Sequence, residues 1–303
     1  MKQTNILCKI FLCIIFCTHS SFDYAQGVKV YTKTGETFKI PYEQLDRITT
    51  YESQDAEGEI SGGSNVPFDE NRSRTFTVNG VSFCMIPVKA GIFQMGSSSS
   101  TYRGTDEYPV HSVTLTQNYY IGESEVTQAL WKAVMGTETM NADEYPVSKI
   151  SYKDVTVFIS KLNSLTGEQF RMPTEAEWEY AARGGNKSKK YTYSGRNALN
   201  PIAWYEGNSS YYSHKVKTKE PNELGIYDMS GNVFEWCSDW YSSSYYSNSP
   251  SKDPTGPVSG QYRVIRGGSY FSEDECRNSA RSYDAPDRQS SYIGARLALT
   301  ASN

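Results

Sequence analysis

The side chains able to do redox or metal chemistry are few and widely spaced in this chain of 303 residues. After residue 26 the only cysteines are Cys84, Cys237 and Cys276, and the only histidines are His111 and His214. None of them forms a CxxC or HExxH motif, the spacings that bring two ligands onto one metal ion. We therefore expect neither a zinc centre nor a multi-histidine iron centre. The odd number of cysteines also leaves at least one thiol unpaired.

Hard oxygen ligands are better placed than sulfur or nitrogen ligands. Asp228 and Glu235 flank a turn that contains Gly231. Calcium binds several oxygen atoms, and a turn of this kind can direct carboxylates and backbone carbonyls to one point. The alternative is a capped turn with two solvated acids.

Aromatic and small polar side chains near the C-terminus are candidates for ligand binding. Residues 209–213, 241–249 and 290–292 are rich in Tyr, Ser and Asn, the residue types that antibody loops use for contact area and adaptable hydrogen bonding. The alternative is a set of exposed polar loops. Trp236, Trp240 and Tyr241 can form an aromatic platform, although core packing is the favoured interpretation of the two tryptophans.

Two arginines extend this candidate region. Arg281 and Arg296 can clamp a carboxylate group of a ligand, because a guanidinium binds a carboxylate in a bidentate manner. The alternative is structural pairing of these arginines with Asp284 or Asp287.

Three helices are predicted to position these groups. The first follows Thr127 and ends at Gly136, and the second ends near Gly167 after an apolar face of Val155, Phe158, Ile159 and Leu162. The third begins at Thr174, which forms a capping box with Glu177, and stops at Gly184 and Gly185. Residues 83–96 and 110–122 read as strands, and after residue 186 short strands and loops dominate. This order predicts the α+β class.

Three further regions precede this main domain, which we place at residues 75–300. Lys2 and an apolar stretch at 6–16 predict a signal peptide over residues 1–26, and therefore an exported protein that is periplasmic, on the cell surface or secreted. Residues 27–52 predict a small β unit with a hairpin turn at Thr34 and Gly35, and residues 53–74 have the composition of a linker. No later segment is long and apolar enough to be a transmembrane helix.

The charge balance excludes one class of partner. The chain has 34 acidic and 30 basic residues, so its formal net charge is −4. General nucleic-acid binders carry a basic excess. We therefore expect no nucleic-acid partner.

Three sequence blocks together resemble one known family. They are RMPTEAEWEYAARGG at 171–185, NELGIYDMSGNVFEWCSDWY at 222–241, and the group RVIRGGSY, RNSARSYDAPD and IGARLAL within 263–299. With them, residues from about 80 to 299 resemble the formylglycine-generating enzyme, or sulfatase-modifying factor, family. The resemblance implies an elaborated C-type-lectin-like fold with little regular secondary structure, preceded here by the small β unit. It also implies a calcium site formed by Asp228, the carbonyls of Gly231 and Val233, and Glu235.

The resemblance fails at the catalytic thiols. Active members of the family are copper-dependent oxidases that use two cysteines. Ser272 stands at the first of these positions, and Cys276 aligns beyond the second. One hydroxyl and one displaced thiol form a poor Cu(I) site. We therefore expect neither copper nor iron, and a noncatalytic scaffold for a protein, peptide or glycan ligand. The alternative is a metal-dependent oxidoreductase whose altered site uses Ser272, Cys276 and the acids at 273–275.

The C-terminal block also resembles the variable region of retroelement-diversified proteins, which display changeable ligand-binding residues on the same fold. Together with the candidates above, this resemblance defines the predicted ligand-binding set: Trp240, Tyr270, Phe271, Ser272, Arg281, Tyr283, Asp284 and Tyr292, with Asp274, Ser282 and Ser291 as further candidates.

Overall fold

The computed structural model describes residues 28–31, 37–40, 67–98, 105–136 and 143–302. The chain divides into two compact units, residues 1–58 and 59–303. In the first, β1 (Val28–Tyr31) pairs antiparallel with β2 (Thr37–Ile40), with Val28 opposite Ile40 and Tyr31 opposite Thr37. These two strands confirm the predicted hairpin strands. The predicted signal peptide, the turn at Thr34 and Gly35, and residues 53–66 of the predicted linker lie outside the described residues.

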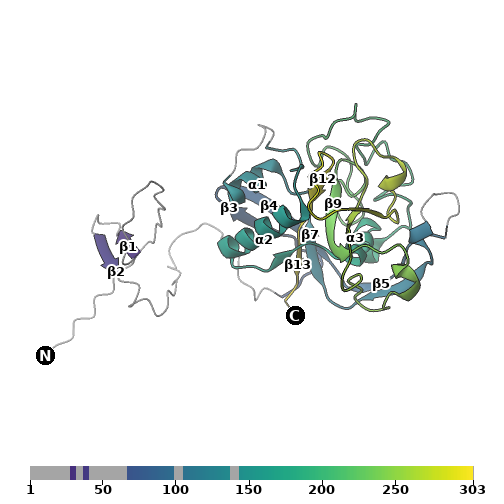
Figure 1. Ribbon diagram of the computed structural model, residues 1–303, viewed down its shortest axis with the longest axis horizontal. Coiled ribbons are helices and arrows are strands. Elements are labelled where there is room, and N and C mark those ends of the chain that lie inside the picture. The colour runs from purple at the N-terminus through teal and green to yellow at the C-terminus, as the bar shows by residue number, and fades with distance from the viewer. Residues whose placement is uncertain (1–27, 32–36, 41–66, 99–104, 137–142, 303) are drawn as a thin grey trace. The chain divides into compact units, whose positions relative to one another are not determined.

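The second unit contains a five-stranded antiparallel sheet (Figure 1). Its strand order is β3 (Arg74–Val78), β4 (Val81–Val88), β7 (Tyr119–Gly122), β13 (Ala298–Thr300) and β8 (Phe170–Arg171). The last strand of the chain, β13, lies between β7 and β8. This pairing brings the C-terminal segment back to the middle of the sheet.

Two helices pack on this sheet (Figure 1). α1 (Gln128–Met135) has Thr127 as its N-cap and Gly136 as a left-handed C-cap, and α2 (Tyr152–Thr166) runs from a capping box at Ser151 to Gly167. The rings of Trp131 and Phe158 stack at 4.8 Å between the two helices. Their apolar faces join side chains of the sheet in one core cluster, so the predicted helices are confirmed together with their buried faces.

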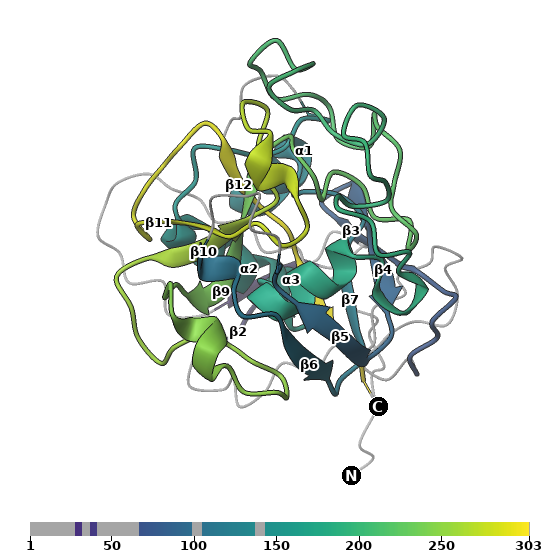
Figure 2. The same ribbon diagram turned by 90° about the vertical axis from the view of Figure 1, so that its right-hand side faces the viewer.

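A second sheet has four strands (Figure 2), and it carries the predicted site residues Glu235, Trp240, Tyr283 and Asp284. Its order is β11 (Ser282–Asp284), β10 (Arg263–Arg266), β9 (Phe234–Trp240) and β12 (Ile293–Ala295), and only β9 and β12 are parallel. α3 (Glu175–Ala182) contacts β9, β10 and the hairpin of β5 (Gly91–Met95) and β6 (His111–Leu115). The predicted capping box of Thr174 and Glu177 is present.

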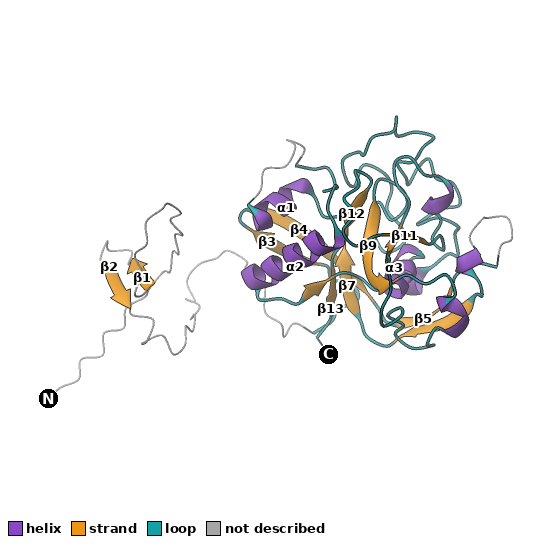
Figure 3. Ribbon diagram, in the orientation of Figure 1, coloured by secondary structure: helices purple, strands orange, loops and turns teal. Residues whose placement is uncertain are grey.

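Loops make up much of the C-terminal half (Figure 3). Between α3 and β13 they are interrupted by strands of three to seven residues and by the 3-10 helices η3 (Gly185–Lys187), η4 (Tyr245–Asn248) and η5 (Asp274–Cys276). A further 3-10 helix, η2 (Thr105–Glu107), precedes β6. None of the described helices has the length and apolar character required to cross a membrane.

Candidate functional site

The hydroxyl of Ser272 and the thiol of Cys276 lie in one buried turn but do not converge. The Cys276 thiol donates to the carbonyl oxygen of Ser272, with Sγ 3.4 Å from that oxygen. The Ser272 hydroxyl instead faces the hydroxyl of Ser269, with the two Oγ atoms 3.0 Å apart. Gly268 allows this close packing, because it has a positive φ of 73° and a Cβ there would lie 2.8 Å from Cys276 Sγ.

The thiol of Cys276 is in an environment that disfavours the thiolate. Burial raises its pKa well above the ordinary value, and the negative charges of Glu275 and Glu273 raise it further. Because the thiolate is both the nucleophile and the metal ligand, this environment suppresses both reactions. Cys84, Cys237 and Cys276 are all free thiols, in line with the expectation that at least one thiol is unpaired.

Asp228 stands at the start of the turn that was predicted to bind calcium. It is buried and has a positive φ of 59°. Its Oδ2 accepts the backbone N–H of Lys217 at 2.8 Å, whereas its Oδ1 is buried without a hydrogen-bond partner among the described residues. Burial raises the pKa of Asp228 to about 6, although the Lys217 N–H opposes this effect. One carboxylate oxygen is therefore desolvated and without a compensating partner.

Glu235 lies at the other end of the turn and already has a cationic partner. Its Oε1 lies 2.6 Å from Nη2 of Arg296, and its Oε2 accepts the indole N–H of Trp178 at 2.6 Å. Arg296 is fully buried. Its partner is Glu235, so the predicted pairing of Arg296 with Asp284 or Asp287 is wrong.

Glu125 is a third carboxylate at this turn, and the sequence analysis missed it. Its oxygens accept the side-chain N–H of Asn232 at 2.8 Å and the backbone N–H of Val233 at 3.1 Å. Burial raises the pKa of Glu125 well above its ordinary value, and the charges of Asp228 and Glu235 raise it further. It lies just before α1, more than 100 residues before its partners, so no local signal in the sequence connects them. Among the residues that the structure describes, no group of three or more His, Cys, Asp or Glu side chains has an arrangement that could hold a metal ion.

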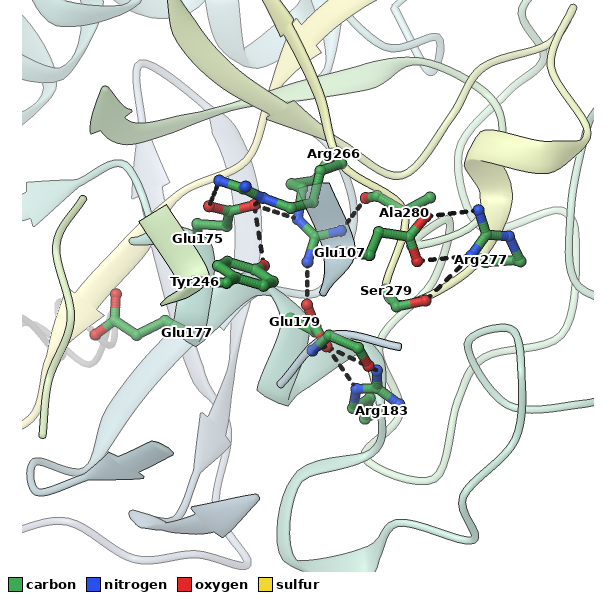
Figure 4. Close-up of polar contacts among 12 residues, drawn as sticks. Glu107, Glu175, Glu177, Glu179, Arg183, Tyr246, Arg266, Arg277, Ser279 and Ala280 are labelled. Atoms are coloured by element: carbon green, nitrogen blue, oxygen red, sulfur yellow. Dashed lines mark hydrogen bonds and ion pairs between the residues drawn. The ribbon is translucent and has the colours of Figure 1, made fainter. Parts of the chain in front are cut away.

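Arg281 belongs to a buried ionic network that joins α3 to the C-terminal loops. Figure 4 shows Glu175, Glu179 and Arg266 of this network. The Nε and Nη2 atoms of Arg281 donate to the two oxygens of Glu175 at 2.8 and 2.9 Å. Arg266 lies between Glu175 and Glu179, donates to Glu179 and also to the carbonyl of Ala280. The predicted partners of Arg281, Asp284 and Asp287, are therefore also wrong. The structure places the guanidinium in the core rather than among the exposed side chains.

A second ion pair fixes the same segment. Arg277 donates to both oxygens of Glu107, at 2.7 and 2.8 Å, and Glu107 belongs to η2 (Figure 4). Burial alone would raise the pKa of Glu107, but the hydrogen bonds and charge of Arg277 lower it overall. Buried arginines thus fix residues 266–281 to the core. Other side chains between residues 266 and 292 reach the surface.

The first group of surface side chains comprises the exposed Phe271 and the partly buried Tyr270 and Tyr292. The ring of Phe271 contacts Tyr292 and Tyr270 edge to face, with centroid distances of 4.8 and 5.3 Å. Phe271 is 38% exposed. The Tyr270 hydroxyl hydrogen-bonds the hydroxyl of Ser291 at 3.0 Å. The structure therefore brings together three members of the predicted ligand-binding set, in a group that we call the Phe271 surface.

A second group lies along β11. Tyr283 is 49% exposed, and its ring stacks on Tyr241 at 4.1 Å and contacts Tyr262 at 5.0 Å. Asp284 accepts the N–H of the next residue. Trp240 is covered by the guanidinium of Arg263, which lies 3.6 Å from the ring centroid.

Three further predicted residues are buried, namely Trp236 of the aromatic platform and Ser272 and Arg281 of the ligand-binding set. Trp236 is fully buried and donates to the Ile150 carbonyl, which agrees with the core-packing interpretation. Ser272 and Arg281 are 7% and 8% exposed, so neither side chain is accessible to a ligand at the surface.

A pocket of about 600 Å³ lies apart from these groups, with α2, β8 and the start of α3 among its walls. Its apolar walls include Ile159 and Phe170. The charged pair on its lining is Arg171 and Glu177, whose side chains bind each other at 2.6 and 2.7 Å. None of the predicted ligand-binding residues lines this pocket.

Comparisons with known proteins agree over the second unit. Residues 75–301 match the family described as the sulfatase-modifying factor enzyme 1-like domain. The chain is 37% identical over 196 residues to the formylglycine-generating enzyme of Streptomyces coelicolor, covering 58% of this chain and 60% of that enzyme. It is 31% identical over 244 residues to the chaperone protein LppX of Paenibacillus barcinonensis, covering 63% of this chain and 80% of LppX. The chain thus spans less than two thirds of the Streptomyces enzyme.

Two solved structures share the fold over nearly their whole length. Treponema denticola variable protein 1 superimposes with a TM-score of 0.68 and 33% identity, covering 75% of this chain and 98% of that protein. PvdO from Pseudomonas aeruginosa gives a TM-score of 0.65 and 25% identity, covering 77% of this chain and 99% of PvdO. These likenesses confirm the fold class predicted from the sequence.

Proposed function

Because the chain belongs to the sulfatase-modifying factor family, with its elaborated C-type-lectin-like fold, we propose that it acts as a noncatalytic scaffold that binds a protein, peptide or glycan ligand. The ligand contacts the Phe271 surface and the exposed Tyr283. A calcium ion stabilises the turn between Asp228 and Glu235. The protein works after export, with residues 1–26 as its signal peptide.

The observation that carries this proposal is the geometry of Ser272 and Cys276. A Cu(I) centre requires two sulfur ligands that converge on one ion. Here one position is a hydroxyl, and the single thiol is buried, donates to a carbonyl and has a raised pKa. This arrangement supports the proposal that the chain has the fold of the family but not its copper-dependent oxidase activity.

The arrangement of the exposed rings supports the binding role. Buried ion pairs fix the segment that carries Tyr270, Phe271 and Tyr283, so these side chains are presented on a rigid frame. Rigid aromatic side chains lose little conformational entropy on binding. Treponema denticola variable protein 1 shares this fold, and its name describes a variable protein. Exposed side chains can vary without loss of the fold when the ion pairs that fix their segment are buried in the core.

The calcium part of the proposal rests on Asp228. Its buried Oδ1 atom has no partner among the described residues. When all three are ionised, Glu125, Asp228 and Glu235 outnumber the neighbouring cations Arg296 and Lys217 and leave excess negative charge at this turn. A divalent cation would neutralise that charge and complete the coordination of Oδ1. Asp228 and the carbonyls of Gly231 and Val233 would hold the ion, with Glu235 shared between it and Arg296.

A direct test is incubation of the protein with a sulfatase-motif peptide and copper under air, followed by mass spectrometry of the peptide. We expect the peptide cysteine to remain unchanged, and conversion to an aldehyde would overturn the proposal. The sequence identity to formylglycine-generating enzymes favours one competing function, a metal-dependent oxidoreductase with an altered site. Metal analysis after dialysis separates the two, because calcium alone supports binding, whereas stoichiometric copper or iron with dioxygen uptake supports catalysis.

A further inference from the structure

We infer that the Phe271 surface recognises a cationic ligand, namely a peptide segment that carries lysine or arginine side chains. This inference rests on the proposed binding function and narrows it to one ligand chemistry. Its basis is that four exposed acidic residues lie in the two loops that carry the exposed rings of Phe271 and Tyr211.

The loop at 205–212 extends the Phe271 surface. The backbone N–H of Glu206 donates to the Ser272 carbonyl at 3.3 Å, and the hydroxyl of Ser209 donates to the Tyr270 carbonyl. Tyr211, 60% exposed, follows in the same loop, with its hydroxyl 3.5 Å from Oε1 of Glu206. The hydrogen bonds to residues 270 and 272 thus join this loop to the segment that carries Phe271.

Four acidic residues adjoin these rings. Glu206 lies beside Tyr211, and Glu273, Asp274 and Glu275 directly follow Phe271 and Ser272 at η5. All four are exposed, and within the described part of the chain none of them forms an ion pair with a lysine or arginine. The exposed acids Glu144 and Glu220, by contrast, pair with Lys215 and Arg196.

Two arginines that follow Phe271 in the sequence, Arg277 and Arg288, do not cancel this charge. Arg277, the next arginine along the chain, is buried and bound to Glu107. Arg288 is exposed, but it lies towards the Ser291 and Tyr292 end, where its Nε donates to the hydroxyl of Ser290. The surface is therefore acidic at the Phe271 and Tyr211 end.

This combination matches the requirements of an ammonium or guanidinium group. Such a cation is attracted to the face of an aromatic ring and to nearby carboxylates. Each ring contributes about twofold to fivefold in affinity at an exposed site, so several rings with four carboxylates give a specific preference. An anionic ligand, including nucleic acid, would be repelled from the acidic end.

Selection from a phage-displayed random dodecapeptide library tests the inference. The full chain and the F271A variant serve as parallel targets, after thermal unfolding has shown that both are folded. We expect the sequences lost on F271A to be enriched in lysine and arginine. F271A-dependent sequences without basic enrichment would overturn the inference and leave the binding function intact. If no selected sequence depended on Phe271, the proposed binding surface itself would be contradicted.

Charge variants give a quantitative second measurement. The probe is fluorescein-labelled hexalysine, read by fluorescence anisotropy, with acetylated hexalysine as the uncharged control. We expect E273Q/D274N/E275Q to weaken binding of the probe by about tenfold or more, and F271A by about fivefold. The matched variant D143N/E144Q/E220Q removes three exposed acids outside this surface and should change binding less than twofold. Equal loss in the two triple variants would show adsorption to general negative charge and overturn the inference.

Discussion

Arg281 and Glu175 form a bidentate ion pair in the core, with Nε 2.8 Å from Oε1 and Nη2 2.9 Å from Oε2. The two residues are 106 positions apart in the chain. Glu175 begins α3, and Arg281 directly precedes β11, the strand that carries the exposed Tyr283. The pair therefore fixes a candidate ligand-binding segment to a helix.

The substitution Arg281→Ala should destabilise the protein strongly. Removal of one partner of a buried ion pair typically lowers the free energy of unfolding by about 3–5 kcal/mol, and here it leaves Glu175 with the more distant Arg266, 3.3 Å away, as its remaining cationic partner. Urea denaturation followed by circular dichroism measures this loss. The matched variant Arg288→Ala removes an exposed arginine and should stay within about 0.5 kcal/mol of wild type. Equal stability of both variants would contradict a structural role for the pair.

The substitution Asp239→Asn should change how stability depends on pH. Burial and the charge of Glu175 raise the pKa of Asp239 from 3.8 to about 7. Between these values the native state keeps a proton that the unfolded state has lost, so the contribution of Asp239 decreases as pH rises from about 4 to about 7. The full difference corresponds to about 4 kcal/mol.

Asparagine cannot ionise, yet its side-chain oxygen can still accept the Glu175 N–H that Asp239 Oδ2 accepts at 3.0 Å. The variant should therefore gain stability relative to wild type as pH rises through that window. Chemical denaturation at pH 4, 5, 6 and 7 provides the measurement, and parallel curves for the two proteins would refute the prediction.

Cysteine labelling should distinguish the three thiols of the second unit. Cys237 and Cys276 are fully buried, and burial raises the pKa of both thiols. Cys84 is half-buried. With iodoacetamide at pH 8, peptide mapping by mass spectrometry should show label on Cys84 first, and on the other two only after denaturant is added. Rapid labelling of native Cys276 would indicate an accessible thiolate and revive a catalytic interpretation.

Calcium should raise the melting temperature of the wild-type protein but not that of the Asp228→Ala variant. At a calcium concentration 100 times the dissociation constant, binding stabilises the native state by about 2.7 kcal/mol. Asp274→Asn, an exposed acid, serves as the control and should respond like wild type.

The calcium effect should also weaken below about pH 6. The pKa of Asp228 is raised to about 6 in the absence of metal, and a carboxylate must lose its proton to bind calcium. A wild-type melting temperature that did not respond to calcium at pH 7.5 would exclude the proposed site.

Local patterns in the amino-acid sequence were sufficient to predict the three helices of the second unit. Thr127 and Thr174 begin their helices as predicted, because a cap is made between residues three positions apart. Glycines with positive φ at 136 and 167 end the first two helices for the same local reason. The motifs at 171–185, 222–241 and 263–299 indicated the family, and the fold class followed from it.

The pairing of the buried charged residues, by contrast, depends on how the elements pack in three dimensions. Arg281 and Arg296 were expected to bind a ligand or the nearby Asp284 and Asp287, yet they pair with Glu175 and Glu235. Glu125 joins Asp228 and Glu235 across more than 100 residues without any motif. An unpaired charge in the interior is unfavourable because it has lost its hydration. The packing of the sheets and α3 therefore places each buried charge beside an opposite charge, whatever their separation in the sequence. Spacing in the sequence indicates only which residues are neighbours along the chain, so it cannot predict these long-range ion pairs.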